Sequence, residues 1–544
     1  MQACICRLIV NSENKKTLLS VKDLSVSFNT QNGLINIIDN ISFDIYSGEN
    51  LAIVGESGSG KSVTALSLLR LHEEVNTKYS GAIDFQDKNL LALNKQEIQN
   101  VRGKNISMIF QEPMTSLNPV FTIGQQIEEV LTLHQNLQKG EKQKRVIELL
   151  DQVGIRQPEH KVDVFPHTLS GGQRQRVMIA MALACKPSLL IADEPTTALD
   201  VTIQQQILDL LADIQKDTGM SVLLITHDLN MVRRFANRVC VMQDGKIVES
   251  NETEQLFSQP QHDYTKFLLD SEPDQKIATV QAGTDVVISA QNLRCYFPVY
   301  KGFFKRKVDE IKAVDDITLS LFSGETLGIV GESGSGKTTL GLAMFRLLAS
   351  QGEIYFKNQN VSQFSEKHMR PLRRHFQIVF QDPFSSLSPR MTVRQIIEEG
   401  LILHFPQLNG GQRLEKIYAV LQEVGLDDDV LWRYPHEFSG GQRQRIAIAR
   451  TVVLEPDVIL LDEPTSALDV SVQKQVLGLL AQLQEKRQLS YLFISHDLRV
   501  VRAMSHRVIV MRQGKVVEQG DVEEVFNNPQ HEYTRELAAA SLYH

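Results

Sequence analysis

The chain contains Gly55-Glu56-Ser57-Gly58-Ser59-Gly60-Lys61-Ser62, and this stretch decides its fold because it fits the pattern G-x-x-x-x-G-K-S/T. The apolar run Leu51–Val54 before it predicts a strand, and the pattern from Val63 to Leu71 predicts a helix. Between a strand and a helix, the glycines let backbone N–H groups close on phosphates, and the helix N-terminus adds partial positive charge. The sequence therefore predicts a phosphate-binding loop rather than a plain glycine turn.

The same arrangement recurs in the second half, where a strand at Leu327–Val330 and a helix at Thr339–Leu348 flank Gly331-Glu332-Ser333-Gly334-Ser335-Gly336-Lys337-Thr338. In such loops the lysines, here Lys61 and Lys337, reach the β- and γ-phosphates of a nucleotide. The hydroxyls of Ser62 and Thr338 hold Mg²⁺. Two loops of this kind predict two sites that bind ATP and Mg²⁺.

Composition and charge restrict the class of protein. With 544 residues, of which 42% are hydrophobic and 22% charged, the chain is long enough for two homologous halves that each bury a core. The net charge of −8 argues against nucleic acid as the main partner, since phosphate-backbone binders carry a basic face. No stretch reaches the roughly 18 apolar residues of a membrane span, and Met1–Val10 is too short and too weakly charged for a signal peptide.

Patterning along each half predicts an α/β fold. Residues 21–54 alternate apolar and polar side chains, which is typical of an antiparallel β region. Residues 120–185 have mostly helical periodicity, and residues 188–225 then read as strand, helix and strand, which predicts a mostly parallel sheet with helices on its faces. We expect an N-terminal extension at 1–17, a first domain at 18–269, a polar linker at 270–285 and a second domain at 286–544.

A further set of residues follows each phosphate loop in the same order. A glutamine ends an apolar strand, Ser-Gly-Gly-Gln comes next, an Asp-Glu pair ends another strand, and a histidine ends a third. The members are Gln111, Ser170, Gly171, Gly172, Asp193, Glu194 and His227 in the first half, and Gln381, Ser439, Gly440, Gly441, Asp462, Glu463 and His496 in the second. Each motif alone is weak, because a carboxylate pair also serves as a helix cap. The ordered repetition of the whole set favours a catalytic role.

This set resembles that of the ATP-binding cassette (ABC) proteins, whose signature is Ser-Gly-Gly-Gln, over nearly all of both halves. The resemblance implies two tandem ABC ATPase cassettes, each with a RecA-like, mostly parallel sheet core, an antiparallel β subdomain and a helical subdomain. It also implies a role for each residue: Asp193 and Asp462 assist Mg²⁺, Glu194 and Glu463 polarise the attacking water, Gln111 and Gln381 sense the γ-phosphate and Mg²⁺, and His227 and His496 contact the γ-phosphate. Neither half departs from the family pattern at these positions, so we expect both sites to be competent.

Composite sites are a second implication of the resemblance. One site would combine residues 55–62 with Ser439, Gly440 and Gly441, and the other would combine residues 331–338 with Ser170, Gly171 and Gly172. Because both signatures are present in one polypeptide, we expect the cassettes to pair within the chain rather than as a homodimer. Phe28 and Phe297 stand where the family stacks an aromatic ring on adenine, and the neighbouring Tyr296 is the alternative in the second half.

Three phrases resemble the bacterial peptide and nickel importer branch of the family. They are residues 112–119 and 382–389 after the two glutamines, the similar phrases at 261–269 and 530–537 that both begin Gln-His-x-Tyr-Thr, and the insertion from Pro298 to Asp315. The whole chain is similar to the fused double-ATPase subunit that powers uptake of peptides, including microcin C-like ones. The implied partners are two permease subunits and a substrate-binding protein at the cytoplasmic face of the cell membrane, without nucleic acid. The C-terminal cysteine cluster of many relatives is missing, so we expect no iron–sulfur cluster.

Other interpretations remain open from the sequence. A soluble tandem cassette acting on ribosomes or DNA shares the layout, but those proteins have a long charged linker or zinc cysteine pairs, which this chain lacks. A sugar-importer ATPase lacks the phrases above. Met114 and Phe384 are apolar residues in polar turns, which favours a permease-facing patch over inward packing. The basic-aromatic segment 301–307 fits either a solvated hairpin tip or a tip near lipid headgroups or a partner.

Overall fold

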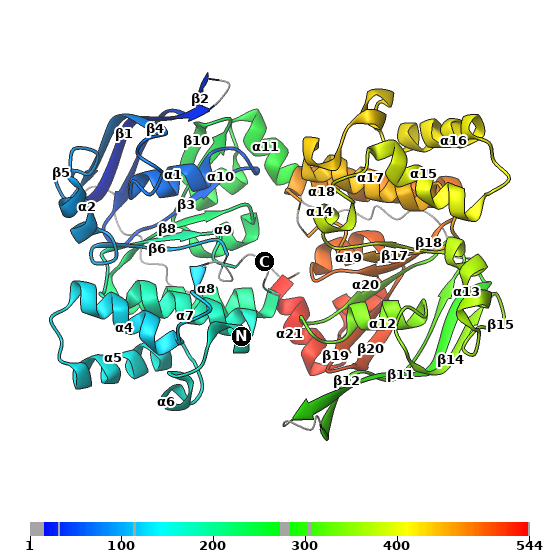
Figure 1. Cartoon of the computed structure of the whole chain (residues 1–544). Coiled ribbons are helices and arrows are strands. Elements are labelled where there is room, and N and C mark those ends of the chain that lie inside the picture. The colour runs from blue at the N-terminus through cyan, green and yellow to red at the C-terminus, as the bar shows by residue number, and fades with distance from the viewer. Residues whose placement is uncertain are drawn as a thin grey trace. The chain divides into compact units, whose positions relative to one another are not determined.

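The computed structural model describes residues 16–30, 33–112, 116–196, 199, 201–271, 283–301, 306–466 and 468–541. The chain divides between Asp270 and Ser271 into two compact units, here called unit 1 and unit 2. Figure 1 shows unit 1 in blue to green and unit 2 in green to red. Most of the expected extension and of the expected linker lies outside the described residues, so the boundaries at 17 and 285 stay predictions.

Unit 1 contains two sheets. An antiparallel sheet has the order β2-β1-β4-β5, and a larger sheet has the order β10-β9-β3-β8-β7-β6. The larger sheet is parallel except for the edge strand β10. The strands are β1 (Thr17–Thr30), β2 (Gly33–Tyr46), β3 (Asn50–Val54), β4 (Thr77–Phe85), β5 (Lys88–Asn89), β6 (Ile106–Ile109), β7 (Leu189–Asp193), β8 (Ser221–Thr226), β9 (Arg238–Gln243) and β10 (Lys246–Glu252).

The parallel order determines where the functional residues lie. Strand β3 pairs with both β8 and β9, and β7 pairs with both β8 and β6. The carboxyl ends of these strands therefore lie along one edge of the sheet, which is where open α/β sheets bind ligands. The phosphate loop follows β3 at this edge, and the glutamine, the acidic pair and the histidine follow β6, β7 and β8.

Helices cover the sheets of unit 1. They are α1 (Lys61–Leu68), α2 (Lys95–Val101), α4 (Ile123–His134), α5 (Lys139–Gln152), α6 (Pro158–Lys161), α7 (Gly171–Leu183), α8 (Val201–Thr218), α9 (Leu229–Phe235), α10 (Thr253–Ser258) and α11 (Asp263–Asp270). Polar residues begin several of them. Thr122, for example, forms a capping box with Gln125, so that side-chain oxygens accept the N–H groups that the first turn leaves unbonded.

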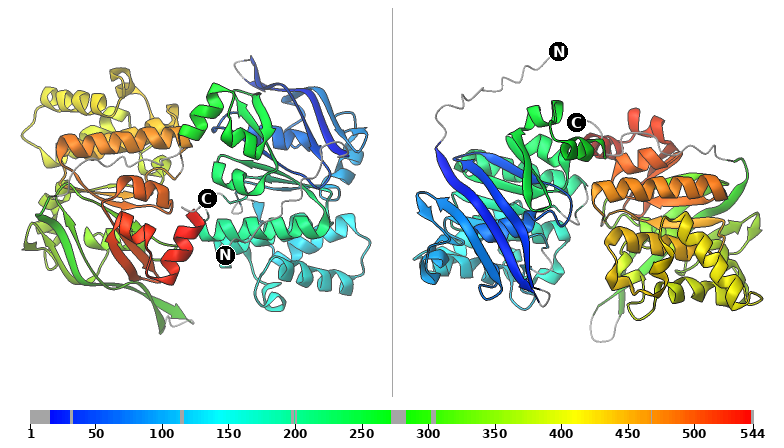
Figure 2. Two further views of the ribbon diagram at one scale, coloured as in Figure 1. Left: turned by 180° about the vertical axis from the view of Figure 1, so that it is seen from behind. Right: turned by 90° about the horizontal axis from the view of Figure 1, so that it is seen from above.

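The central sheet separates two hydrophobic cores, because successive side chains of a strand point to opposite faces. On β3, Leu51 and Ile53 join a core shared with α1 and the antiparallel sheet. Ala52 and Val54 join a second core shared with α4, α5, α7 and α8. In Figure 1, and from behind in Figure 2, the antiparallel strands and the helices α4 and α5 accordingly lie on opposite sides of the core strands.

Unit 2 repeats this architecture, with the sheet orders β12-β11-β14-β15 and β16-β17-β18-β13-β19-β20. Its strands are β11 (Val286–Lys301), β12 (Arg306–Phe322), β13 (Thr326–Val330), β14 (Gln351–Phe356), β15 (Gln359–Asn360), β16 (Phe376–Val379), β17 (Val458–Asp462), β18 (Ser490–Ile494), β19 (Arg507–Arg512) and β20 (Lys515–Asp521). Its α-helices are α12 (Lys337–Met344), α13 (Glu366–Leu372), α14 (Pro383–Ser386), α15 (Val393–His404), α16 (Gly410–Glu423), α17 (Gly440–Val452), α18 (Val470–Arg487), α19 (Leu498–Met504), α20 (Val522–Asn527) and α21 (Glu532–Ser541).

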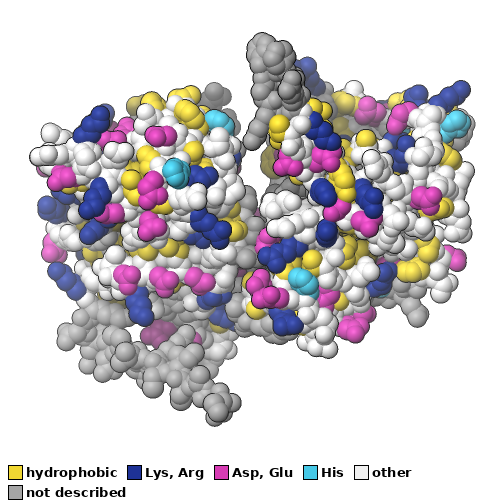
Figure 3. All heavy atoms as spheres, turned by 90° about the horizontal axis from the view of Figure 1, so that it is seen from below, with side chains coloured by type: hydrophobic (Ala, Val, Ile, Leu, Met, Phe, Trp, Pro, Cys, Tyr) yellow, Lys and Arg dark blue, Asp and Glu magenta, His cyan; other side chains and the backbone are white. Residues whose placement is uncertain are grey.

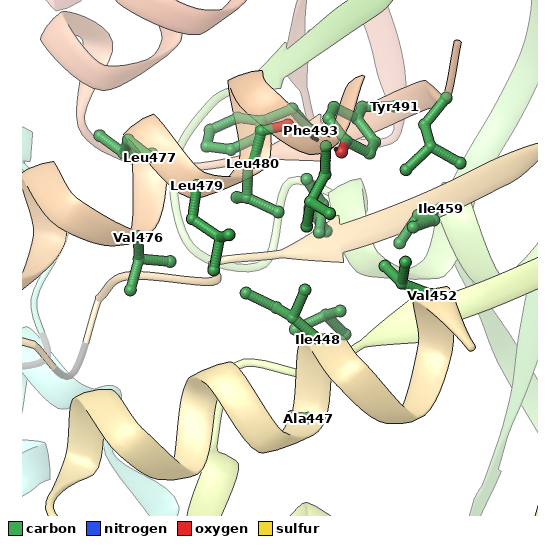
Figure 4. Close-up of a cluster of buried hydrophobic side chains, with 14 of the residues drawn as sticks. Ala447, Ile448, Val452, Ile459, Val476, Leu477, Leu479, Leu480, Tyr491 and Phe493 are labelled. Carbon is green, nitrogen blue, oxygen red and sulfur yellow. Dashed lines mark hydrogen bonds between the residues drawn. The ribbon is translucent and has the colours of Figure 1, made fainter. Parts of the chain in front are cut away.

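Part of the larger core of unit 2 is drawn in Figure 4. Ile448 and Val452 of α17 point toward Ile459 of β17, and Leu480 of α18 and Phe493 of β18 belong to the same core on this face of the sheet. All five side chains are at most 1% exposed. This packing places the start of α17 and the end of β17 in one rigid body, as its counterpart does in unit 1.

The structure confirms the predicted fold class but changes several helix ends. The predicted helices reached Leu71 and Leu348, whereas α1 ends at Leu68 and α12 ends at Met344. Arg70 and Arg346 follow these ends with φ of 50° and 53°, a left-handed backbone that stops a helix. The insertion in the second half is a longer hairpin of β11 and β12, whose connecting residues 302–305 lie outside the described part. Within the described residues, no helix is long and apolar enough to cross a membrane.

Candidate functional site

The phosphate loop of unit 1 requires its glycines. Gly55 has a φ of 157°, and a Cβ atom there would lie 2.1 Å from the carbonyl oxygen of Met242 at the end of β9. Gly60 has a φ of 102° and ends the loop at the helix α1. In unit 2, Gly331 has a φ of 148°, and its Cβ would lie 2.2 Å from the carbonyl oxygen of Met511. Both loops therefore wrap closely over the end of a neighbouring strand, which only glycine allows.

Each loop holds its own lysine. Lys61 Nζ donates to the carbonyl oxygens of Gly55 and Glu56, both at 2.7 Å. Lys337 Nζ donates to the carbonyl oxygens of Gly331 and Glu332 at 2.8 and 2.9 Å. Both lysines are almost fully buried. The cations therefore lie inside the loops, where a phosphate would compete with the carbonyls for the ammonium group.

A hydroxyl and a carboxylate meet next to each loop. Ser62 Oγ donates to Asp193 at 3.1 Å, and Thr338 Oγ1 donates to Asp462 at 3.0 Å. Burial raises the pKa of Asp193 to about 6, and burial also raises the pKa of Asp462. A raised pKa marks a carboxylate that a cation would stabilise in its ionised form. Oxygen donors of these two kinds suit Mg²⁺.

The glutamate after each aspartate has an unusual backbone. Glu194 and Glu463 have φ of 46° and 47°. This left-handed conformation is strained for a residue with a side chain, and such strain gathers at functional sites. The N–H groups of Glu194 and Glu463 donate to the carbonyl oxygens of Ile225 and Ile494, at 2.8 and 2.9 Å. The neighbouring strand thus holds each glutamate in place.

Two further side chains hold each glutamate carboxylate. Gln111 Nε2 donates to Glu194 Oε2 at 2.7 Å, and His227 Nδ1 lies 3.0 Å from Glu194 Oε1. In unit 2, Gln381 Nε2 donates to Glu463 Oε2 at 2.8 Å, and His496 Nδ1 lies 3.2 Å from the same oxygen. Residues at the ends of β6, β7 and β8, or of their counterparts in unit 2, therefore meet at one carboxylate. The glutamine and the glutamate are more than 80 positions apart in the sequence in both units.

These pairs change the protonation of the groups involved. The hydrogen bond with Glu194 raises the pKa of His227 above its ordinary value. At His496, burial is the largest effect and opposes the charged form, but the hydrogen bond and charge of Glu463, with the charge of Asp497, together outweigh it and the pKa is raised. Burial alone would raise the pKa of Glu463, but the hydrogen bond and charge of His496, with the charge of Lys337, lower it. The pair in unit 2 therefore favours an ionised glutamate beside a charged imidazole.

The Ser-Gly-Gly-Gln sequences begin the helices α7 and α17. Ser170 and Ser439 are the cap residues, and each forms a capping box with the glutamine three residues later. A Cβ atom on Gly172 would lie 2.8 Å from Ile203 Cγ2, and one on Gly441 would lie 2.4 Å from Val472 Cγ1. The glycines therefore allow α8 and α18 to begin against these helix starts, whose N–H groups and partial positive charge suit an anion.

The three candidate adenine-stacking residues differ in their surroundings. Phe28 is half-buried, and the ring of His72 packs edge-on against it, with centroids 5.0 Å apart and an interplanar angle of 84°. The Tyr296 hydroxyl donates to the Asp315 carboxylate. Phe297 is 40% exposed and pairs across the hairpin with Ile311. Phe297 is thus the more exposed of the two candidates in unit 2.

Sequence analysis missed two tyrosines of the site. The Tyr264 hydroxyl accepts a hydrogen bond from the N–H of Glu56 at 3.1 Å, and the Tyr533 hydroxyl accepts one from the N–H of Glu332 at 2.8 Å. Both lie in the repeated Gln-His-x-Tyr-Thr phrase, which sequence analysis used only as a mark of resemblance. Their exact repetition in both halves was the signal that pointed to a function.

The surface around unit 2 carries exposed aromatic residues. Phe384 in α14 is 57% exposed, with the guanidinium of Arg443 3.9 Å above its ring, so inward packing is wrong for this residue. Met114 lies outside the described residues. The single tryptophan, Trp432, is 63% exposed beside Arg394. On the face in Figure 3, lysine and arginine side chains are interspersed with aspartate and glutamate rather than gathered in one basic field.

The fold and these sites define a tandem phosphate-loop ATPase. Within the described residues, no group of three or more His, Cys, Asp or Glu is arranged to hold a metal ion. Comparison with known protein families supports this class of protein. The ABC transporter family matches residues 38–197 and 314–466. The C-terminal region of oligopeptide/dipeptide transporters matches residues 248–297 and 517–543. The chain belongs to the ABC transporter family, which confirms the resemblance, and it is an ATP-hydrolysing transport subunit with two cassettes.

Known relatives match over almost the whole chain. A peptidoglycan transport ATP-binding protein, YejF, of Agrobacterium fabrum is 56% identical over 97% of this chain and 97% of its own length. An uncharacterized ABC transporter ATP-binding protein, YejF, of Escherichia coli K12 is 53% identical over 97% of this chain and 100% of its own length. The glutathione import ATP-binding protein GsiA of Shigella boydii is 47% identical over 96% of this chain and 89% of its own length.

Proposed function

We propose that this chain powers a peptide importer by coupling ATP binding and hydrolysis at two sites to uptake through separate permease subunits. The observation that carries the proposal is the complete Glu-Gln-His cluster in both units. A match to the C-terminal region of oligopeptide/dipeptide transporters in each half supports peptide cargo. Relatives named for peptidoglycan transport and glutathione import support it too, since both compounds contain peptides. Oligopeptides, dipeptides and microcin C-like peptides all fit this class.

Hydrolysis uses the geometry described above. Lys61 exchanges its loop carbonyls for the β- and γ-phosphates, and Glu194 orients the attacking water while His227 holds its carboxylate and contacts the γ-phosphate. Gln111 donates a hydrogen bond to the same Glu194 carboxylate and senses the γ-phosphate. The same roles fall to Lys337, Glu463, His496 and Gln381 in unit 2. Phosphoryl transfer to water needs mainly positioning and charge stabilisation, which these groups supply.

Mg²⁺ fits the oxygen donors beside each loop. Ser62, Asp193 and Gln111 would hold it in one site, and Thr338, Asp462 and Gln381 in the other. When bound, it neutralises charge on the phosphate oxygens. The bound cation would also stabilise the ionised forms of Asp193 and Asp462, and so offset the free energy that burial of their charges costs.

In this proposal, the signature of the other cassette completes each nucleotide-binding site. The capped helix starts at Ser170-Gly171-Gly172 and Ser439-Gly440-Gly441 present N–H groups to a γ-phosphate, which supports this assignment. Phe28 and Phe297 stack on adenine. Of the two neighbours in unit 2, the exposure of Phe297 and the bond of Tyr296 to Asp315 favour Phe297.

Two permease subunits and a substrate-binding protein complete the importer, so the chain lies at the cytoplasmic face of the cell membrane. The exposed ring of Phe384, together with Met114 in the corresponding phrase of the first half, supports docking of permeases at these turns. Recovery of the chain from membranes, with mass spectrometry of attached proteins, tests this. We expect two permeases in equal amount.

A double variant sharpens the test. Met114→Asp with Phe384→Asp is expected to lose permease attachment and peptide uptake but to keep ATP affinity, since neither residue belongs to a phosphate loop. Val75→Asp is the matched control, because Val75 is 90% exposed and apolar but lies outside both turns. Normal retention of the double variant would contradict the docking assignment. Recovery of ribosomes or DNA in place of permeases would support the soluble alternative.

A further inference from the structure

Each phosphate loop is tied to the C-terminal region of its own unit. The N–H of Glu56, the second residue of the first loop, donates to the Tyr264 hydroxyl at 3.1 Å, and the hydroxyl in turn lies 3.4 Å from the Glu56 carboxylate. In unit 2, the N–H of Glu332 donates to the Tyr533 hydroxyl at 2.8 Å. The bond spans 208 positions in unit 1 and 201 in unit 2. Two halves with many sequence differences therefore keep the same link.

The tyrosine and the lysine hold the same peptide from two sides. Lys61 Nζ binds the carbonyl oxygen of Gly55, while Tyr264 binds the N–H of Glu56, which belongs to the same peptide group. Lys337 and Tyr533 do the same at the peptide group between Gly331 and Glu332. When a phosphate draws the lysine away from the carbonyl, the tyrosine bond stays available. The tyrosine bond would therefore restrain the loop with a nucleotide as well as without one.

The tyrosines are themselves held firmly. Tyr264 is 8% exposed and Tyr533 is 1% exposed. The turn before Tyr264 is anchored by Glu249 of β10, whose carboxylate oxygens accept the N–H groups of Gln261 and His262 at 3.0 and 2.9 Å. In unit 2, Glu518 of β20 accepts the N–H groups of Gln530 and His531 at 2.9 and 3.0 Å. The link thus runs from an edge strand, through a turn and a helix start, to the phosphate loop.

We propose that Tyr264 and Tyr533 are positioning residues that preset the phosphate loops for nucleotide, so that the C-terminal region of each half is a working part of its ATP site. Without the hydroxyl, the peptide of Glu56 or Glu332 samples other orientations. The apparent affinity for nucleotide then falls in proportion to the fraction of loops in the competent shape. Because the lost interaction is the same in the ground state and the transition state, the turnover at saturation is preserved.

The test compares three tyrosine-to-phenylalanine changes in the full chain. Tyr264→Phe with Tyr533→Phe removes both hydroxyls without removing the rings. Tyr491→Phe is the matched control, because Tyr491 is fully buried and its hydroxyl donates to the carbonyl oxygen of Leu480 at 2.9 Å, inside the core of unit 2. The readouts are KM and kcat for ATP with Mg²⁺, the Kd of ADP by calorimetry, and Tm.

We expect KM and the Kd of ADP to rise about two- to tenfold in the double variant, as for the loss of one hydrogen bond, with kcat within about twofold of the parent. Tyr491→Phe is expected to lower Tm without changing either constant. Glu249→Gln with Glu518→Gln cuts the link at its far end and is expected to shift affinity in the same direction. Unchanged affinity in the double tyrosine variant, or an equal shift in Tyr491→Phe, would overturn the proposal.

Discussion

The buried lysines show how single residues prepare the sites. Lys61 and Lys337 are 5% and 7% exposed, and each ammonium group binds two carbonyl oxygens of its own loop. A buried cation without partners is costly, so these carbonyls stabilise the loops before a nucleotide arrives. Each loop therefore holds its lysine inside without leaving the ammonium charge unpaired.

Removal of either lysine is expected to abolish most activity. Lys61→Ala and Lys337→Ala each delete the cation that neutralises the β- and γ-phosphates, and we expect a loss of about 10²-fold or more in kcat/KM. The two losses are expected to be comparable, because the contacts of the two lysines match. Steady-state ATPase assays of each variant in full-length protein measure this. Near-normal turnover of either one would show that its site is dispensable.

At the scale of elements, close approach of two helix starts shapes each signature. Gly441 near the start of α17 faces Val472 of α18, where a Cβ atom would lie 2.4 Å from Cγ1. Alanine is about 1 kcal/mol better than glycine in a helix interior, but overpacking costs about 1–3 kcal/mol. The clash is therefore expected to outweigh the gain in helix propensity.

Gly441→Ala is accordingly expected to lower the free energy of unfolding by about 1–2 kcal/mol. Addition of Val472→Ala is expected to restore part of that loss, because it removes the methyl group that clashes. Gly478→Ala in α18 is the control, since nothing lies within 4 Å of its Cβ position, and it is expected to stabilise the protein. Chemical denaturation of the parent and the three variants measures the order of their free energies of unfolding. A stabilising Gly441→Ala would contradict the close packing.

A partly buried ion-pair cluster links the helices α15 and α16. Glu398 accepts from Arg413 Nε at 2.8 Å and from Arg394 Nε at 3.2 Å, and its side chain is 13% exposed. The hydrogen bond from Arg413 lowers the pKa of Glu398 below its ordinary 4.5, although burial opposes this. Because the folded pKa is the lower one, the stabilisation is present above 4.5 and is lost as the pH falls through the folded value.

Glu398→Gln is therefore expected to destabilise the protein by about 1–2 kcal/mol at neutral pH. The difference in unfolding free energy between the variant and the parent is expected to shrink once the pH falls below 4.5. Glu398 of the parent then becomes protonated, first in the unfolded state and at lower pH in the folded state. Denaturation curves of both proteins between neutral and acidic pH measure this. A difference that stays constant over the range would exclude the charge of Glu398 as its cause.

Much of each site could be predicted from the sequence, because most of its motifs are formed by residues that are close together in the chain. A strand, a glycine loop and a helix in succession predict the phosphate loop at 55–62, and strand ends predict where Asp193 and His227 lie. The strain at Glu194, with a φ of 46°, has no sequence signal, since its N–H is held by Ile225, which is distant in the sequence. The Tyr264 bond is likewise hidden, because it joins residues 208 positions apart.

Helix ends were harder to predict for the same reason. No glycine marks the end of α1, and Arg70 takes the left-handed conformation there instead. Its guanidinium donates to the carbonyl oxygens of Leu90 and Leu93, at 3.4 and 2.6 Å, so contacts with a distant turn favour the conformation. Arg346 ends α12 in the same way through Val361 and Phe364. The sequence pattern shows helical periodicity, but tertiary contacts decide where it stops.

At the scale of the whole molecule, one chain carries everything that a pair of cassettes needs. Two phosphate loops and two capped signatures are present, so ATP is expected to act within a single polypeptide. Glu194→Gln with Glu463→Gln is expected to retain nucleotide binding but to slow hydrolysis, and so to trap the ATP-bound state. Light scattering of this variant with ATP is expected to give the mass of one chain, 61.4 kDa. A stable ATP-dependent dimer of full chains would contradict pairing within the chain.

The lone tryptophan turns one region of the molecule into an optical reporter. Trp432 ends the short helix η4 (Asp428–Trp432), is 63% exposed, and has the Arg394 guanidinium of α15 5.2 Å from its ring centre. Since the indole is already largely in water, its emission wavelength is expected to change little on unfolding. A protein that covers this region of unit 2 would shift the emission to the blue. Fluorescence titration of the unlabelled chain can therefore distinguish a partner that buries this surface from one that binds elsewhere.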